Sequence, residues 1–208
     1  MRTIAIIPAY NEEKTIARVV TAAQNSKYID QVVVVNDGSE DHTSQMAESA
    51  GAVVLEMGCN RGKGAAIQAG LQRTDSEVIL FLDADLIGLT SAHIDTLLAP
   101  VISGQVDMTL GVFDHGRAAT DLAQKITPFL SGQRAIKRSI LRQLPSLDEL
   151  GFGVEVALTR FVKSNGIAYQ EVILPEVSQV TKEEKFGLLD GFTRRLRMYW
   201  DIVRALAQ

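Results

Sequence analysis

The sequence predicts an α/β fold: a doubly wound, mostly parallel sheet in a single domain. In residues 1–100, short β-rich runs alternate with longer helical patterns, which is the spacing of parallel βαβ units. The run VVVV at residues 32–35 is apolar throughout, as expected of a parallel strand covered by helices on both faces. A length of 208 residues, with 46% apolar and 22% charged residues, is typical of one globular domain with its own core.

In the first half, strands are expected at residues 4–8, 31–36, 52–56 and 77–82. Helices are expected between them, at about 12–25, 41–50 and 63–73, the second capped by Asp41. The first helix directs one apolar face inward, formed by Ile16, Val19, Val20 and Ala23. In the third, Ile67 and Leu71 point inward. Ligands of such open sheets bind beyond the carboxyl ends of the strands, so the residues that follow each strand are the candidate site.

The second half is less regular. We expect a helix at about 91–103, a strand at 106–111, a basic helical segment and a turn at 131–133. A helix after residues 151–153, a strand near 168–174 and an amphipathic helix from about residue 186 follow. No linker or repeat separates the halves, 1–110 and 111–208, so they are expected to share one sheet within a domain of residues 1–208.

The net charge of −4 conceals an asymmetry between these halves. Residues 1–100 hold seven basic and thirteen acidic residues, whereas residues 101–208 hold fourteen basic and twelve acidic ones. Between Gly116 and Pro145, six basic residues face one acidic residue, Asp121. Such a cluster either attracts phosphates or anionic headgroups, or forms a solvated helix face.

Apolar runs are far shorter than the roughly eighteen residues that span a bilayer, and the N-terminus reads as a first strand and not as a signal peptide. One cysteine, Cys59, excludes an intramolecular disulfide and fits a reducing compartment. The expected location is therefore cytoplasmic.

The motifs PAYNEE and NDGSEDHT follow the first and second strands. Each places carboxylates and small polar residues where they can accept hydrogen bonds from a base or ribose and then cap the next helix. Helix capping alone explains Asn11, Ser39 and Asp41, but explains Glu12 and Asp37 less well.

Two further motifs suit a diphosphate and a metal ion. In NRGKG, Gly62 and Gly64 flank Lys63 at a helix start, where backbone amides and a cation favour an anion. In FLDADL, Asp83 and Asp85 lie two apart after a hydrophobic strand, so an extended backbone would project both carboxylates from one side. Two hard oxygen ligands suit Mg²⁺ or Mn²⁺ carried by a diphosphate.

Together, in this order, the four motifs resemble those of the GT-A fold glycosyltransferases of family 2. The resemblance covers about residues 3–90 and implies a metal-dependent enzyme that uses a nucleoside-diphosphate sugar, UDP-glucose or GDP-mannose. It implies that Asp37, next to Gly38, reads the base, that Lys63 lies near the base or phosphate, and that Asp85 binds the metal and diphosphate. It places Asp83, next to Ala84, near the ribose. The nucleoside pocket that it implies is lined by Pro8, Ala9, Tyr10 and Glu12.

In the second half, SGQRAIKRSIL and GFGVEVALTRF look like segments of the polyprenyl-phosphate sugar transferases within this family, and are also similar to glucosyl-3-phosphoglycerate synthases, another GT-A group. The lipid-phosphate branch usually continues its acidic motif as D-A-D-L-Q, with the glutamine near the metal, but here Ile87 takes that place. Because an apolar side chain cannot ligate Mg²⁺, either water or a distant residue such as His115 would fill the position.

The expected acceptor is an anionic phosphate, with polyprenyl phosphate ahead of phosphoglycerate. A hydroxyl acceptor would need a general base, for which the candidates are Asp148, Glu149 and Glu155, whereas an anionic oxygen needs none. The residues expected to hold the acceptor are basic: Arg117, Arg134, Lys137 and Arg138, with Lys182 and Lys185 in addition.

The segment 186–208 interleaves apolar residues with arginines, so it lies on a membrane surface or packs as a core or dimer helix. The expected partners are therefore the sugar nucleotide, the acceptor, a membrane face or integral membrane partner, and a second copy of the chain, but no nucleic acid. Two rival functions are a nucleotidyltransferase and a non-catalytic module that binds nucleotide sugars. A glycine-rich loop after the first strand would favour the former, and this chain has PAYNEE there instead.

Overall fold

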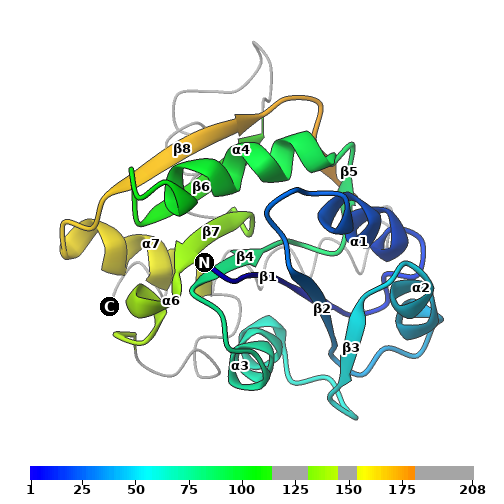
Figure 1. The fold of residues 1–208 in the computed structure, drawn as a ribbon. Helices are drawn as coiled ribbons and strands as arrows, with labels where there is room; N and C mark the ends of the chain where they lie inside the picture. The colour runs from blue at the N-terminus through cyan, green and yellow to red at the C-terminus, as the bar shows by residue number, and fades with distance from the viewer. Residues whose placement is uncertain (114–130, 145–153, 181–208) are drawn as a thin grey trace.

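A computed structural model describes residues 1–113, 131–144 and 154–180 (Figure 1). Their strands form a seven-stranded sheet of order β3-β2-β1-β4-β7-β6-β8 and a small sheet of β5 and β9. The strands are β1 (Thr3–Ala9), β2 (Gln31–Asn36), β3 (Val53–Glu56), β4 (Val78–Phe81), β5 (Leu86–Ile87), β6 (Met108–Phe113), β7 (Arg134–Lys137), β8 (Tyr169–Leu174) and β9 (Ser178–Gln179). The helices are α1 (Ile16–Gln24), α2 (Thr43–Ser49), α3 (Lys63–Arg73), α4 (Ser91–Ile102), α6 (Arg138–Leu141) and α7 (Val154–Ser164).

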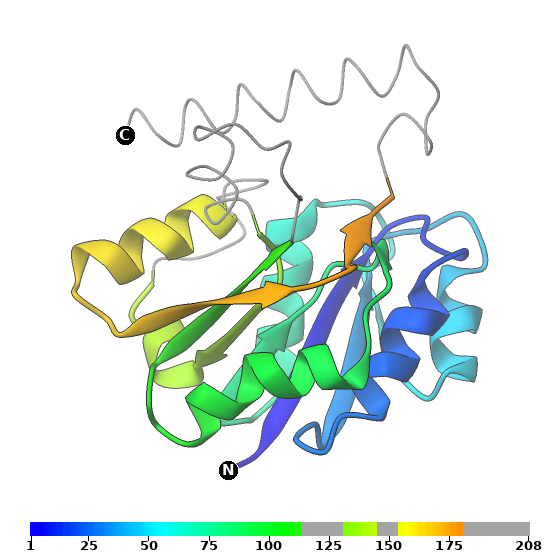
Figure 2. The ribbon, with the colours of Figure 1, turned by 90° about the horizontal axis from the view of Figure 1, so that it is seen from above.

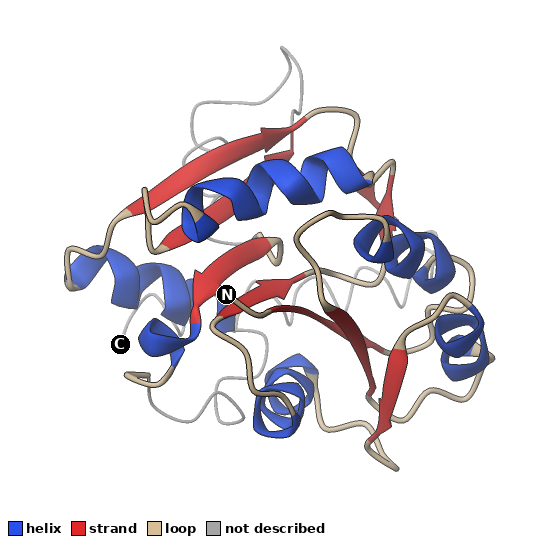
Figure 3. Ribbon diagram, in the orientation of Figure 1, coloured by secondary structure: helices blue, strands red, loops and turns tan. Residues whose placement is uncertain are grey.

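The large sheet is mostly parallel, as predicted. β1 pairs in parallel with β2 and β4, β2 with β3, and β6 with β8, whereas β7 runs antiparallel to both of its neighbours, β4 and β6. Figure 3 shows β8 and β3 at the two edges of this sheet. Strands from both halves of the chain therefore share one sheet, which confirms that expectation.

Helices cover both faces of the sheet because successive strand residues point to opposite sides. In β1, Ala5 and Ile7 pack into the core under α1 and α4, whereas Ile4 and Ile6 pack into the core under α3, α6 and α7. Figures 1 and 2 show the strands between these two layers of helices. The run of valines at residues 32–35 is buried on both faces, as its apolar pattern predicted.

Most predicted elements occur within a few residues of their expected bounds. The first helix begins later than expected, at Ile16, because Asn11 has a positive φ of 55° and a turn precedes the helix. The second helix was expected to be capped by Asp41, but its N-cap is His42; Asp41 lies one residue earlier, and its Oδ1 accepts a hydrogen bond from the Thr43 N–H at 3.0 Å. β7 is a correction: the sequence analysis expected no strand at Arg134–Lys137.

In the described part of the chain, no helix combines the length and the apolar character that crossing a bilayer requires. The amphipathic segment 186–208 and the basic helical segment before residue 131 lie outside the described residues. Their predicted roles at a membrane, and the possibility of a dimer helix, stay predictions.

Candidate active site

The polar segments that follow β1, β2 and β4 meet where these parallel strands end. This end of the strands is the carboxyl edge of the sheet, as distinct from its outermost strands β3 and β8. Ala9 lies beside Asn36 in the register of β1 and β2, and Ile6 lies beside Phe81 in that of β1 and β4. Because these strands are parallel, the residues after them gather at the carboxyl edge of the sheet. The structure thus brings Tyr10 and Asp37 to the same edge, with Asp83 beyond the end of β4.

Hydrogen bonds tie the first two of these segments to each other. The Asn11 N–H donates to Ser39 Oγ at 2.9 Å, and Asn11 Oδ1 accepts from the Glu40 N–H at 2.9 Å. The Glu12 N–H donates to Thr43 Oγ1 at 2.8 Å, and the Glu12 side chain is buried. These residues therefore form one wall of the candidate site, where Pro8 and Ala9 end β1 and Tyr10 follows them.

The buried carboxylate of Asp37 holds the loop that leads into α3. Its Oδ1 accepts the Arg61 N–H and its Oδ2 accepts the Gly62 N–H, both at 2.8 Å. The next residue, Gly38, has a φ of +74°, and a Cβ at that position would lie 2.6 Å from the backbone carbon of Cys59. Asp37 and Gly38 therefore fix the position of the turn that carries Lys63.

Lys63, at the start of α3, lies between two carboxylates. Its Nζ is 2.5 Å from Asp83 Oδ1 and also forms an ion pair with Glu155 Oε1, from the first turn of α7. Burial disfavours the charged amine, but the two carboxylates outweigh this effect and raise the pKa of Lys63 above its usual value. The ammonium is therefore charged at any pH at which the protein would be assayed.

Asp83 accepts hydrogen bonds from two glutamines besides its ion pair. The Nε2 atoms of Gln133 and Gln179 donate to Asp83 Oδ2 at 2.8 and 2.6 Å. Burial opposes ionisation of Asp83, but Lys63 and the two carboxamides hold its pKa below the usual value. Neither glutamine is among the predicted site residues, although Gln133 lies inside the motif SGQRAIKRSIL; no sequence signal marks Gln179.

The chemistry of the donor set fits a hard divalent cation. The carboxylates of Asp83 and Asp85 offer the oxygen ligands that Mg²⁺ and Mn²⁺ prefer. Within residues 1–113, 131–144 and 154–180, no group of three or more His, Cys, Asp or Glu side chains could hold a metal. Such a cation would therefore take further ligands from a substrate or from water.

The backbone of the acidic motif differs from the expected one. β4 ends at Phe81, and Ala84 and Asp85 lie in a turn before β5, so the motif is not an extended strand that projects both carboxylates alike. Ile87 follows on β5 and is 43% exposed, opposite Ser178 of β9. The Asp85 C=O accepts the Val180 N–H at 3.1 Å, which anchors β9 beside the motif.

The described basic residues of the second half do not gather at one place, which corrects the expected grouping. Arg134 pairs with Phe81, at the carboxyl edge of the sheet, whereas Lys137 pairs with Val78 at the opposite edge. Lys137 Nζ is 2.7 Å from Asp107 Oδ1. The next residue, Arg138, donates through Nη2 to the Leu71 C=O at 2.7 Å. An antiparallel strand of four residues thus carries its two cations to opposite ends.

Arg134 is 1% exposed and lies beside the candidate site. Its Nε donates to the Ser131 C=O at 2.8 Å and its Nη1 donates to Thr159 Oγ1 at 2.9 Å. Burial lowers the pKa of Arg134 to about 10, against the opposing effect of the nearby carboxylates of Glu155 and Asp83. The guanidinium keeps its charge at neutral pH and is enclosed by protein groups.

Other predicted site residues lie outside the described residues. They are the acceptor candidates Arg117, Lys182 and Lys185, the base candidates Asp148 and Glu149, and the metal candidate His115. Their predicted roles remain predictions.

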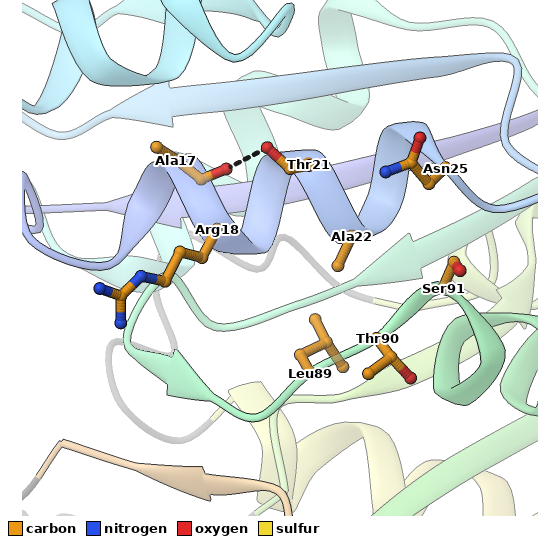
Figure 4. Close-up of a pocket in the computed structure, with 8 residues that line it drawn as sticks. All are labelled: Ala17, Arg18, Thr21, Ala22, Asn25, Leu89, Thr90 and Ser91. Carbon is orange, nitrogen blue, oxygen red and sulfur yellow. Dashed lines mark hydrogen bonds between the residues drawn. The ribbon is translucent and has the colours of Figure 1, made fainter.

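Two recesses on the described surface are lined by other residues than the polar cluster of the candidate site. One, of about 390 Å³, is lined by Arg18 and Thr21 of α1, by Asn25 directly after it and by the loop before α4, as Figure 4 shows. In it, Thr21 Oγ1 donates to the Ala17 C=O within α1 at 2.7 Å. The other, of about 450 Å³, lies by Glu13 and His42. Neither contains Asp37, Lys63 or Asp83, so the candidate site rests on the polar cluster at the sheet edge.

Comparison with known proteins gives relatives of two kinds. The chain is 29% identical over 195 residues to the glucosyl-3-phosphoglycerate synthase of Mycobacterium tuberculosis, which covers 76% of this chain and 60% of that protein. It is 32% identical over 137 residues to a dolichyl-phosphate beta-glucosyltransferase of Trichomonas vaginalis, which covers 59% of this chain and 42% of that protein. The chain thus spans well under two thirds of the length of these relatives.

A solved structure shares the fold over almost the whole chain. The crystal structure of the Mycobacterium tuberculosis glucosyl-3-phosphoglycerate synthase in complex with Mn²⁺ and UDP-glucose superposes with a TM-score of 0.78 at 25% identity, which covers 99% of this chain and 77% of that one. The family model described as "Glycosyl transferase family 2" matches residues 4–162, three quarters of the chain and all four motifs. The chain belongs to glycosyl transferase family 2 and has the GT-A fold that its motifs predicted.

Proposed function

We propose that this protein transfers glucose from UDP-glucose, bound together with Mn²⁺ or Mg²⁺, to a phosphate-bearing acceptor. The observation that carries the proposal is the cluster of Lys63, Asp83 and Glu155 beside Asp85, at the sheet edge where Asp37 fixes the loop before α3. The names of both kinds of relative contain a glucosyl group, one as a glucosyl-3-phosphoglycerate synthase and one as a dolichyl-phosphate beta-glucosyltransferase, and a solved complex of the first contains UDP-glucose and Mn²⁺.

The uridine would lie against the wall formed by the first two polar segments. Tyr10 is half-buried there, and Asp37 already holds the loop before α3 through two backbone amides, so this part of the candidate site is ordered before UDP-glucose binds. A preformed pocket loses little conformational entropy when a ligand binds. Asp83 would face the ribose, held by its three donors.

Asp85, with Asp83 beside it, would hold the metal ion. When bound, the ion would neutralise the charge that develops on the departing diphosphate. Lys63 would support the same charge through its ammonium group, which is already fixed in place between Asp83 and Glu155. The bond between the anomeric carbon and the diphosphate oxygen breaks, a bond to the acceptor oxygen forms, and UDP leaves.

Glu155 is the base candidate that lies among the described residues, and its carboxylate is buried and paired with Lys63. To accept a proton from a neutral hydroxyl, this carboxylate would first have to give up its ion pair with Lys63. An acceptor whose own phosphate oxygen attacks needs no base. The pairing therefore supports a polyprenyl phosphate as the acceptor.

Phosphoglycerate is the second candidate acceptor, favoured by the longer match to the glucosyl-3-phosphoglycerate synthases. In that product the 3-phosphate is retained, so the phosphate would bind and a hydroxyl or carboxylate oxygen would attack. Such a reaction would draw on Asp148 or Glu149, on an oxygen that is already anionic, or on the donor's own phosphate.

The test combines the purified protein, UDP-glucose labelled in the sugar and Mn²⁺ with four acceptors: a polyprenyl phosphate, 3-phosphoglycerate, and the alcohol forms of each without phosphate. We expect label on a phosphate-bearing acceptor, none on its phosphate-free counterpart, and loss of transfer with EDTA. UDP release that is indifferent to both phosphates would refute the proposal. GDP-mannose in place of UDP-glucose tests the donor.

A further inference from the structure

We propose that the carboxamides of Gln179 and Gln133 form a clamp that positions Asp83 for the sugar nucleotide. Gln179 and Gln133 are positioning residues in this proposal, because they act through Asp83 and not on the reacting atoms. The inference rests on the proposed function in one respect: the donor that Asp83 faces is taken to be UDP-glucose.

The geometry of the Asp83 carboxylate carries the proposal. Its Oδ1 is 2.5 Å from Lys63 Nζ, while its Oδ2 accepts from Gln133 Nε2 at 2.8 Å and from Gln179 Nε2 at 2.6 Å. The backbone of Gly132 lies against the same group, since a Cβ at that position would come within 2.5 Å of Oδ2. Three hydrogen-bond donors and the Gly132 backbone thus fix the plane of the Asp83 carboxylate.

The two glutamines reach Asp83 from distant parts of the chain, Gln133 from the residue before a short strand and Gln179 from within one. Gln133 directly precedes β7, whose first residue pairs with Phe81 at the end of β4. Gln179 lies on β9, which pairs with β5 so that Gln179 stands opposite Leu86. Gln133 lies 50 residues and Gln179 lies 96 residues beyond Asp83 in sequence. The pairing of both strands with the acidic motif therefore serves to bring the carboxamides to it.

The orientation of the carboxamides follows from charge. Facing an ionised carboxylate, a carboxamide is bound through its N–H groups, because its oxygen would be repelled. Lys63 keeps Asp83 ionised, so both side chains donate. A hydrogen bond from a neutral donor to a charged acceptor is among the stronger ones in proteins. Without the clamp, the Asp83 carboxylate could rotate about its Cβ–Cγ bond, toward Lys63 and away from the proposed sugar nucleotide.

Gln179 is the better residue to vary because it is exposed, so a change there leaves the core intact. Three substitutions of Gln179 separate the alternatives: to leucine, which removes the donor; to lysine, which keeps one; and to glutamate, which opposes Asp83. Ser178→Ala is the matched control, since Ser178 lies on the same short strand and is also exposed. Binding of UDP-glucose with Mn²⁺ is measured by calorimetry, and KM and kcat by transfer assay.

If Gln179 acts as a donor, Gln179→Leu raises the Kd and the KM for UDP-glucose about tenfold, with kcat changed much less. Gln179→Lys stays close to the unsubstituted protein, Gln179→Glu is weaker than Gln179→Leu, and Ser178→Ala changes nothing. The opposite order, with glutamate tolerated and lysine damaging, would make Gln179 a metal ligand and overturn the proposal. Equal effects of the three Gln179 substitutions would mean that only the shape of the side chain matters there, and would also overturn the proposal.

A second measurement uses no sugar nucleotide, so it separates failure of this inference from failure of the proposed function. Gln179→Leu is compared in the unsubstituted chain and in an Asp83→Ala background by thermal unfolding of the free protein. We expect the Tm to fall by about 2 °C in the first and to stay unchanged in the second. An equal fall in both backgrounds would overturn the clamp even if the protein binds UDP-glucose. If Gln179 and Asp83 are coupled in a protein that binds no sugar nucleotide, the clamp is supported and the proposed sugar-nucleotide substrate is refuted.

Discussion

The parallel strands of the first half and the antiparallel β7 of the second half place their polar residues differently in space. The polar residues of the first half follow the ends of β1, β2 and β4, which all run in one direction, so they meet at one edge. β7 has a cation at each end, and the strand separates them: Arg134 lies at the site edge and Lys137 at the opposite edge. Strand direction therefore decides whether sequence neighbours become neighbours in a site.

The same comparison applies to charge. In the first half, the polar groups bind each other across loops, as Asp37 does with two backbone amides. In the second half, the described cations are held one by one, Arg134 by Ser131 and Thr159, and Lys137 by Asp107. A count of basic residues thus says little about where an anion binds.

The largest effect should come from the acidic motif. Asp85→Asn is expected to reduce glucose transfer about a thousandfold, because it removes a carboxylate that would hold the metal and diphosphate. The measurement is kcat with saturating Mn²⁺ and UDP-glucose. Asp107→Asn, an acid at the opposite edge of the sheet, is the control and should stay within about twofold. Equal activity of both variants would remove the difference between the two edges.

Lys63→Met should lower kcat about a hundredfold if Lys63 supports the charge of the departing diphosphate as proposed, since it removes a positive charge that Asp83 holds in place. Lys63→Arg should retain part of the activity, because the charge remains while its position changes. Single-turnover transfer isolates the chemical step in both variants. Full activity of Lys63→Met would show that the ion-paired cluster is structural.

The two ends of β7 can be compared through stability. Arg134→Met should lower the free energy of unfolding by about 3 kcal/mol, since it removes two buried hydrogen bonds, to the Ser131 C=O and to Thr159 Oγ1. Lys137→Met should cost no more than about 0.5 kcal/mol, because its ion pair is partly exposed. Urea unfolding of both variants provides the measurement. Equal losses would contradict the asymmetry described for this strand.

Gly38→Ala should weaken UDP-glucose binding about tenfold, because its Cβ would collide with the backbone of Cys59 and displace the loop that Asp37 holds. Gly58→Ala is the matched control. Gly58 also has a positive φ, of +72°, but a Cβ there meets nothing within 4 Å. Similar affinities of the two variants would mean that backbone strain, and not the close contact, matters at Gly38.

The smallest effect should be a loss of stability at low pH through His93. Its Nδ1 accepts the Thr90 N–H at 3.2 Å at the start of α4, which requires an unprotonated nitrogen. Burial lowers the pKa of His93, against the opposing effect of Glu176, so folding favours the neutral ring. This stability is present above about pH 6.5, the usual value, and is lost as the pH falls through the lower pKa of the folded state.

Thermal unfolding at pH 8 and pH 5 should therefore show a fall in Tm that is about 2 °C smaller in His93→Gln than in the unsubstituted protein. The glutamine cannot be protonated in this range. An equal fall in both proteins would assign the pH dependence to other groups.

Much of the first half was predictable because its signals are local. Apolar runs marked β1, β2 and β4, and the spacing between them required crossover helices and hence parallel strands. Parallel strands have a common carboxyl edge, so the sequence predicts that PAYNEE, NDGSEDHT and FLDADL lie together. β7 was missed because four residues that begin and end with cations carry no strand pattern.

The sequence by itself determined the fold class, the family and the edge of the sheet on which Asp37, Lys63 and Asp83 lie. The tertiary structure alone decided that Glu155 pairs with Lys63, that Gln133 and Gln179 bind Asp83, and that Arg134 and Lys137 part. These contacts join residues far apart in the chain, and their existence depends on which strands pair and in which direction. Periodicity and motif spacing report local geometry, so they carry no information about such pairings.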